Sequence, residues 1–542
     1  PTPPGAVEAV GRADGVALSW GVPDPASPDL ARYVVYRAPA PEGPFARIGG
    51  FAEHPWRLFD DAPVEPLTVG FYRVAAQDYS GNLSGPSPVA RGTTSIPLQE
   101  GFPLTSALGS VSTPAAADVD GDGVMDILTG REQMYAFHAD ASELKNGDRD
   151  TRTHGPWTQV STSRGFWTSA TVGDLDGDGR LEVAAIEFDT GTLYVWDGEG
   201  VVRPGWPRPT FPNGVPAISS PVFTDLTGDG WLEIVILADD KVLAFRHDGA
   251  EVRDGDGNPA THGILAVVGG RFSYGTPAAA DLDGDGKAEL AIPVRVLPRN
   301  TFPDGRVILL DDDGSVMPGW PLEFEGDMTS SPALADLNRD GKLEVIFGVG
   351  PLHLEVRQLD GTRLPGWPRE VVMNQDIMSS PAVADVDNDG SLDVAIISGN
   401  GTTYLIRADG SNFPGYPFRF TDVLDKPFSS TCAPVLANLD ADEDLEMAFA
   451  NSGGWIVGLN PDASLVEGFP IKIGGEVNVG LAVLDVDHDG FNELIVSGDE
   501  PAVYLYNTRG PVTENPGWPM FHHDGGRTGY VNTPVLSTPA PR

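Results

Sequence analysis

From about residue 115 onward, short apolar segments alternate with an acidic polar loop. Residues 381–384 precede one such loop and residues 392–397 follow it, and both segments are rich in alanine and β-branched residues. Apolar segments this short predict β-strands rather than helices, which usually need about ten residues or more. Each polar loop is therefore predicted to connect two strands.

The polar loop is a nonapeptide that occurs eight times, at steps of 47 to 56 residues, and we number the copies loop 1 to loop 8. With three exceptions, acidic residues occupy positions 1, 3, 5 and 9. In loop 1 these positions are Asp118, Asp120, Asp122 and Asp126. In loops 2 to 8 they are Asp174, Asp176, Asp178 and Glu182; Asp225, Thr227, Asp229 and Glu233; Asp281, Asp283, Asp285 and Glu289; Asp336, Asn338, Asp340 and Glu344; Asp385, Asp387, Asp389 and Asp393; Asn438, Asp440, Asp442 and Glu446; and Asp485, Asp487, Asp489 and Glu493.

This spacing of acids predicts a calcium site in each loop. Calcium is a hard cation that takes about 6–8 oxygen ligands. Carboxylates at alternate positions converge only if the chain turns sharply, and glycine at position 6 permits that turn in seven of the eight loops. One Asp- and Gly-rich segment would also fit an ordinary turn, but eight copies with the same spacing indicate Ca²⁺, with up to eight ions.

Three loops depart from the pattern in ways that predict weaker sites. Thr227 and Asn338 replace the acid at position 3, and Asn438 replaces the acid at position 1. Glu443 stands where loop 7 would have its position-6 glycine. Because side chains disfavour positive φ, we expect loop 7 to be strained or differently wound.

Residues 1–95 lack the acidic loop and form a separate predicted domain. Residues 16–20, 32–36 and 70–77 are strand-like segments separated by Pro- and Gly-rich turns. With Trp20 on an early strand and Tyr33 or Tyr36 on the next, this region resembles a fibronectin type III domain. The resemblance implies a β-sandwich of about seven strands, used in that family mainly as a spacer or binding module.

A second signature, glycine–aromatic–proline, recurs between the loops at residues 101–103, 205–207, 319–321, 366–368, 415–417 and 468–470. One unit then contains about four strands, which is the content of one propeller blade. The sequence predicts an all-β chain whose second part is an eight-bladed β-propeller. Seven blades with one irregular unit, or an open superhelix, are the alternatives. A further copy at residues 517–519 follows loop 8, and we expect residues 517–530 to supply a strand to the first blade and close the ring.

The repeats resemble the FG-GAP/VCBS family, which is known from integrin-type propellers and from secreted bacterial proteins. The resemblance implies one Ca²⁺ per loop, held by the side chains at positions 1, 3, 5 and 9 and by the carbonyl at position 7. The predicted domains are a fibronectin type III-like sandwich at residues 1–95, the propeller at residues 96–530 and a linker-like tail at residues 531–542.

The composition of the chain limits which partners and which cellular compartment we expect. The formal net charge of −43 argues against nucleic acid or an anionic membrane as partner. Cys432 is the only cysteine, so no intrachain disulfide forms, and we expect its thiol in the core. No apolar run is long enough to predict a membrane span. Because weak calcium sites suit millimolar extracellular calcium, the sequence predicts secretion or display at the cell surface.

The sequence contains none of the common catalytic motifs, and His522, His523 and Asp524 form its only dense histidine group. We expect a non-catalytic adhesion or structural module, including a protomer of a surface fibre or layer. Its partners would be other copies of the chain, or a cell-surface or matrix protein or glycan. Two alternatives stay open: a polysaccharide lyase resembling rhamnogalacturonan lyases, and a lectin-like glycan binder. The tryptophans of the glycine–aromatic–proline turns are expected in the core rather than on a sugar-binding platform.

Overall fold

The chain folds entirely into strands and turns in the part that the computed structural model describes. That part comprises residues 1–22, 29–53, 56–104, 112–145, 155–158, 160, 165–210, 219–253, 263–269, 275–296, 305–326, 328, 330–350, 353–371, 379–420, 432–477, 479–498, 502–515 and 517–531. It contains no helix, in agreement with the predicted all-β class. Residues 532–542 of the predicted tail, which was expected at residues 531–542, lie outside the described residues.

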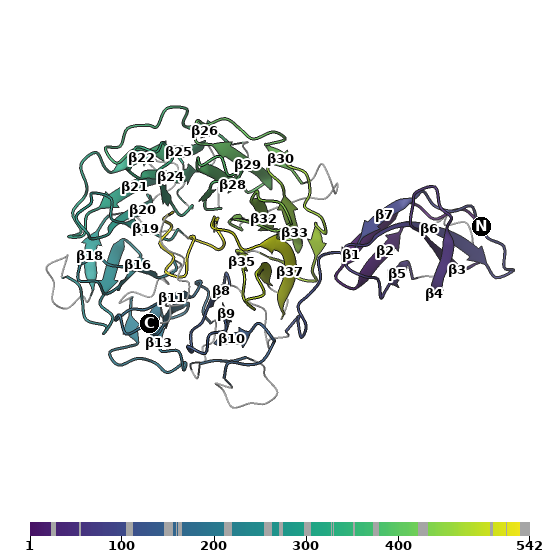
Figure 1. The fold of residues 1–542 in the computed structure, drawn as a ribbon, viewed down its shortest axis with the longest axis horizontal. Coiled ribbons are helices and arrows are strands. Elements are labelled where there is room, and N and C mark those ends of the chain that lie inside the picture. The colour runs from purple at the N-terminus through teal and green to yellow at the C-terminus, as the bar shows by residue number, and fades with distance from the viewer. Residues whose placement is uncertain are drawn as a thin grey trace.

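Residues 1–95, which we call the N-terminal unit, form two antiparallel sheets beside the rest of the molecule (Figure 1). The first sheet has the order β1 (Val7–Arg12), β2 (Gly15–Trp20) and β5 (Leu58–Asp61), and the second has the order β4 (Ala46–Glu53), β3 (Leu30–Ala38), β6 (Val69–Asp78) and β7 (Ala90–Thr93). The three strand-like segments predicted from the sequence are therefore strands. Trp20 packs edge-on against Tyr33, with ring centroids 5.2 Å apart.

The remaining strands form eight small antiparallel sheets, which Figure 1 shows arranged around a ring. The first four are β8 (Ala115–Ala117), β9 (Asp126–Gly130) and β10 (Met134–His138); β11 (Thr171–Gly173), β12 (Glu182–Glu187), β13 (Thr192–Trp196) and β14 (Arg208–Pro209); β15 (Val222–Thr224), β16 (Glu233–Ala238), β17 (Lys241–Phe245) and β18 (Ile264–Val267); and β19 (Ala278–Ala280), β20 (Glu289–Arg295), β21 (Gly305–Leu310) and β22 (Leu322–Phe324).

The last four sheets complete the ring. They are β23 (Ala333–Ala335), β24 (Glu344–Val349), β25 (His353–Arg357) and β26 (Arg369–Glu370); β27 (Ala382–Ala384), β28 (Asp393–Ile397), β29 (Thr402–Arg407) and β30 (Phe418–Arg419); β31 (Val435–Ala437), β32 (Glu446–Ala450), β33 (Trp455–Leu459) and β34 (Ile471–Lys472); and β35 (Ala482–Leu484), β36 (Phe491–Ser497) and β37 (Val503–Pro511).

The second strand of each ring sheet is buried along most or all of its length, because it is covered on both faces. All six residues of β16 are buried. Ile234 and Ile236 join a cluster with side chains of β12, whereas Val235 joins a cluster with side chains of β20. Because successive side chains of a strand point to opposite faces, one strand contributes to the cores on both sides of its sheet.

The glycine–aromatic–proline turns link neighbouring sheets through the core. The indole Nε1 of Trp206 donates a hydrogen bond to the carbonyl of His247 at 3.1 Å, and Nε1 of Trp320 donates to Leu359 at 2.8 Å. Both indoles are buried, as the sequence predicted. These tryptophans therefore fix one sheet to the next rather than presenting a surface for sugars.

The ring closes in a different way from the one predicted. Residues 97–104 pair with β37: the amides of Gln99 and Leu104 donate to the carbonyls of Leu505 and Val503, at 2.8 and 2.9 Å. The segment that enters the ring therefore completes the last sheet, and the prediction that residues 517–530 join the first sheet is wrong.

Residues 517–531 instead cross the centre of the ring (yellow in Figure 1). The carbonyls of Gly525, Gly526, Thr528 and Gly529 accept hydrogen bonds at 2.8–3.0 Å from the innermost strands of four successive sheets, β11, β15, β19 and β23. Arg527 is fully buried there and donates to the carbonyls of Ala170, Phe521 and Pro114. The segment thus binds most of the sheets to one another along the axis of the ring.

Candidate metal sites in the acidic loops

Each acidic loop connects the innermost strand of a sheet to the next strand, as the sequence predicted. Loop 1 joins β8 to β9, and the other seven loops occupy the same place in the other sheets. Positions 1, 3 and 5 are at least partly exposed, apart from the buried Asn438 of loop 7, whereas position 9 lies in the second strand. The residue at position 9 is at most 2 % exposed in all eight loops: Asp126, Glu182, Glu233, Glu289, Glu344, Asp393, Glu446 and Glu493.

The buried carboxylate at position 9 makes the same hydrogen bond in every loop. One of its oxygens accepts from the backbone amide of position 2, as Asp126 does from Val119 at 2.9 Å and Glu446 does from Leu439 at 2.6 Å. In three of the loops the other oxygen is left without a hydrogen-bond partner. Oδ1 of Asp126, Oε1 of Glu289 and Oε1 of Glu446 are buried and accept no hydrogen bond.

Burial makes the ionised form of these acids costly in the absence of a cation. It raises the pKa of Glu289 to about 7, and of Asp393, Glu446 and Glu493 to about 8. A buried carboxylate that keeps one free oxygen is stabilised if it binds a metal ion or accepts a further hydrogen bond. The position-9 acids that keep a free oxygen could therefore hold a metal ion.

The loop backbone is wound so that the other acids face the same space. In loop 1, Gly121 and Gly123 have positive φ, and the amide of Gly123 donates to Asp118 at 3.0 Å. The same bond from position 6 to position 1 recurs in loops 2 to 6 and in loop 8. The glycine predicted to make the turn therefore does so wherever it is present.

Loop 7 is wound differently, which is one of the two outcomes that its Glu443 predicted. Neither Ala441 nor Glu443 has positive φ. The amide group of Asn438 donates to the carbonyl of Asp442 at 3.0 Å, while its Oδ1 is buried without a hydrogen-bond partner. The two departures from the sequence pattern thus change the shape of one loop and leave its buried Glu446 in place.

Several predicted ligand sets come together in space. One oxygen from each of Asp118, Asp120 and Asp126 lies within 4.8 Å of the others. Three further sets are equally close: Asp174, Asp176 and Glu182; Asp281, Asp283 and Asp285; and Asp385, Asp387 and Asp393. Oxygens bound to one calcium ion at about 2.3–2.6 Å can lie up to about 5 Å apart. The residues present therefore fit a hard divalent cation.

Basic side chains face some of the loops, and the sequence pattern did not predict them. Arg203 pairs with Asp176 and Glu182 of loop 2, and Nη1 of Arg407 lies 2.8 Å from Asp387 of loop 6. Arg407 stands directly opposite Asp393 in the hairpin of β28 and β29. Hairpin register would have identified this residue, because it sets which side chains lie across from position 9.

The predicted histidine group lies on the axis of the ring. His522, His523 and Asp524 are at most 2 % exposed, and burial lowers the pKa of His522 to about 4. Asp524 accepts hydrogen bonds from the amide and hydroxyl of Thr528 at 3.0 and 2.6 Å. These contacts hold the group in the interior of the ring. Cys432 is also buried, as predicted.

Comparisons with known proteins identify the repeat. A family model described as FG-GAP-like repeat matches residues 174–236 and residues 225–292, and each match begins at the first acid of a loop. A search of curated proteins finds no match.

In the described part of the chain, no helix is long and apolar enough to cross a lipid bilayer.

Similar solved structures are distant. The V. cholerae biofilm matrix protein Bap1 is 15 % identical, with 79 % of this chain and 94 % of that chain covered and a TM-score of 0.42. Saccharomyces cerevisiae Sqt1 is 13 % identical, with 77 % and 100 % covered and a TM-score of 0.49. At these scores, nothing about the fold or function of this chain rests on either likeness.

Proposed function

We propose that this chain is a calcium-binding, non-catalytic module of the cell surface or extracellular matrix. In this proposal, residues 96–530 form an eight-bladed β-propeller of FG-GAP type, and residues 1–95 form a fibronectin type III-like sandwich. The observation that carries it is the buried acid at position 9, which recurs in all eight loops beside three further oxygen-bearing side chains. Each loop would hold one Ca²⁺, through the side chains at positions 1, 3, 5 and 9.

Calcium would act on the structure rather than on a substrate. It would neutralise acids that repel one another and would fix each innermost strand to the strand that follows it. A ring stiffened in this way, joined to a small sandwich, suits adhesion or assembly with other copies, or with a matrix protein or glycan. Millimolar calcium outside the cell would keep the loops filled, which supports an extracellular location.

A glycan-binding role is the second candidate, because one aromatic pair is open to solvent. Trp167 is 43 % exposed and stacks on Phe188, with ring centroids 4.2 Å apart. Stacked, exposed aromatic rings offer an apolar face of the kind that sugars bind. If Trp167→Ala abolished retention of the chain on a glycan array and left its calcium uptake intact, this role would be established.

Two measurements test the main proposal together. Native mass spectrometry of the full chain in calcium should show several bound ions, up to eight, that disappear with chelator. Negative-stain electron microscopy of the same samples should show filaments or sheets in calcium that disperse on chelation. Absence of bound calcium would refute the metal sites, and isolated rings under both conditions would refute self-assembly. Unsaturated sugar released from a pectin panel would establish the lyase alternative.

A further inference from the structure

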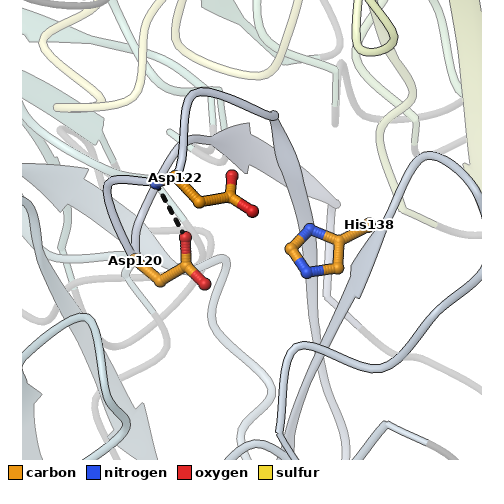
Figure 2. A group of neighbouring side chains, drawn as sticks. All are labelled: Asp120, Asp122 and His138. Carbon is orange, nitrogen blue, oxygen red and sulfur yellow. Dashed lines mark hydrogen bonds between the residues drawn. The ribbon is translucent and has the colours of Figure 1, made fainter.

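In loop 1 a histidine on the neighbouring strand faces the acids. His138 is the last residue of β10 and stands directly opposite Asp126 in the hairpin with β9. Figure 2 shows its imidazole ring turned toward the carboxylates of Asp120 and Asp122. One atom from each of these three side chains lies within 4.8 Å of the others.

The contact between His138 and Asp126 leaves both side chains with unused ligand atoms. Nδ1 of His138 lies 2.9 Å from Oδ1 of Asp126, yet the geometry is not that of a hydrogen bond, and both atoms are buried without any such partner. Asp126 is 0 % exposed, and its other oxygen already accepts from Val119. A buried nitrogen and a buried carboxylate oxygen therefore meet beside two further carboxylates, where a metal ion would satisfy all of them.

Loop 6 provides a natural comparison, because its acids are the same. Aspartate occupies positions 1, 3, 5 and 9 in both loops. The residue opposite position 9 is His138 in loop 1 but Arg407 in loop 6, and it is Asn507 opposite Glu493 in loop 8. Of these three side chains, only the imidazole can donate an electron pair from nitrogen to a metal, since guanidinium has no free lone pair and the amide nitrogen is a poor ligand.

The donor set of loop 1 matches a different class of cation from the all-oxygen loops. Calcium selects oxygen ligands, whereas imidazole nitrogen suits zinc and other first-row transition metals. We propose that loop 1 is a mixed nitrogen–oxygen site for a divalent transition-metal ion of the zinc class, with His138, Asp120, Asp122 and Asp126 as ligands. Asp118, Asp120 and Asp122 also line a solvent-open cleft between loops 1 and 2, which gives the ion a path to the site.

This inference shares the acids of loop 1 with the proposed calcium function and refines it there. It leaves the other seven loops as calcium sites. Zinc and calcium would compete at loop 1, so this single site would respond to zinc while the rest of the ring responds to calcium. Failure of zinc binding would leave calcium uptake by the other loops untouched, whereas failure of calcium uptake would refute the proposed function itself.

The first test measures zinc binding to the full chain by isothermal titration calorimetry in millimolar calcium. The wild-type chain should bind one equivalent of Zn²⁺ more tightly than any other. His138→Asn, which places in loop 1 the residue type that loop 8 has, should lose that equivalent and keep the calcium-induced rise in melting temperature. An unchanged zinc titration in His138→Asn would overturn the proposal.

The reciprocal variant tests the same chemistry in loop 6. Arg407→His gives that loop the ligand set of loop 1, and it should add one tight equivalent of Zn²⁺ to the wild-type number. Arg407→Gln is the matched control, because it removes the same positive charge without adding a ligand, and it should add none. Equal zinc binding by the two loop 6 variants would overturn the proposal, even if His138→Asn failed to fold.

Discussion

The N-terminal unit and the ring are both built from small antiparallel sheets, but their cores contain different groups. The core cluster of the N-terminal unit consists of aliphatic and aromatic side chains, among them Leu18, Trp20 and Tyr33. The ring also buries apolar clusters and, in addition, the position-9 carboxylate of every sheet at no more than 2 % exposure. Burial of apolar surface alone can stabilise the first region, whereas the second is destabilised when its buried acids ionise without a counter-charge. We therefore expect the stability of the ring, and not that of the N-terminal unit, to depend on a bound cation.

Removal of calcium should produce the largest difference in thermal stability between the two regions. Each filled site adds about 2.7 kcal/mol to the free energy of unfolding when calcium is at one hundred times its dissociation constant. Several filled sites together should therefore stabilise the ring more than any single side-chain contact does. In calorimetry, excess chelator should lower the melting temperature of the ring by more than about 10 °C, since a change of 1 kcal/mol moves Tm by at least ~1 °C in a domain of this size. The transition of the N-terminal unit should not move. A joint shift of both transitions would contradict the comparison.

Without metal, the stability of the ring should increase as pH falls, because its buried acids are more stable when protonated. Burial raises the pKa of Asp393, Glu446 and Glu493 to about 8, whereas unfolded acids titrate near pH 4. Between about pH 4 and pH 8 the folded state holds protons that the unfolded state has released, so stability falls as pH rises through this window. Urea midpoints in chelator should therefore be higher near pH 5.5 than near pH 8.

Calcium should reverse that order, because it binds the ionised carboxylates and not the protonated ones. In millimolar calcium, the midpoint should be higher near pH 8 than near pH 5.5. A metal-free midpoint that rose with pH would show that the position-9 acids are ionised in the folded chain without a cation.

A core substitution in the N-terminal unit should give the opposite pattern. Leu18 is 1 % exposed on β2, and Leu18→Ala should cost about 2–5 kcal/mol through lost burial and the cavity left behind. The melting transition of the N-terminal unit should fall by the same amount with and without calcium, while the ring transition stays where it is. If the loss depended on calcium, the two regions would be coupled more tightly than their separate cores suggest.

The smallest effect expected is at loop 6, where Arg407 already provides part of the counter-charge. Its guanidinium lies 2.8 Å from Asp387, and the pair is partly exposed. Exposed pairs contribute about 0.2–1 kcal/mol, so Arg407→Gln should raise calcium affinity at that loop by up to about fivefold. Arg419→Gln, in strand β30 of the same sheet, removes an equal charge elsewhere and is the control for long-range electrostatics. Equal calcium titrations of the two variants would show that Arg407 does not compete with the ion.

The repeated parts of the molecule could be predicted from the sequence because their information is local. The acids of a loop, its position-6 glycine and the flanking strands lie within about 20 residues, and the structure places each of them where the pattern indicates. The buried tryptophans of the glycine–aromatic–proline turns followed in the same way. Each local pattern is weak by itself, but its repetition in eight units made it possible to predict the architecture of the whole ring.

The closure of the ring could not be predicted, because it depends on contacts between distant parts of the chain. Leu98 pairs with Tyr506 and Leu104 with Val503, and no local pattern specifies partners so far apart. The loop neighbours were also missed, although hairpin register places His138 opposite Asp126 and Arg407 opposite Asp393. A prediction that aligned the third strand of each unit as well as its loop would have found both.

Hydrogen exchange of the full chain, followed by mass spectrometry with and without calcium, tests the central claim most directly. Chelation is expected to speed amide exchange in the acidic loops and in the strands that they join, in all or most of the eight sheets. Exchange in β2, β3 and β6 of the N-terminal unit should stay the same. Equal exchange across the ring in the two conditions would contradict the claim that its buried acids hold calcium and that calcium stabilises it.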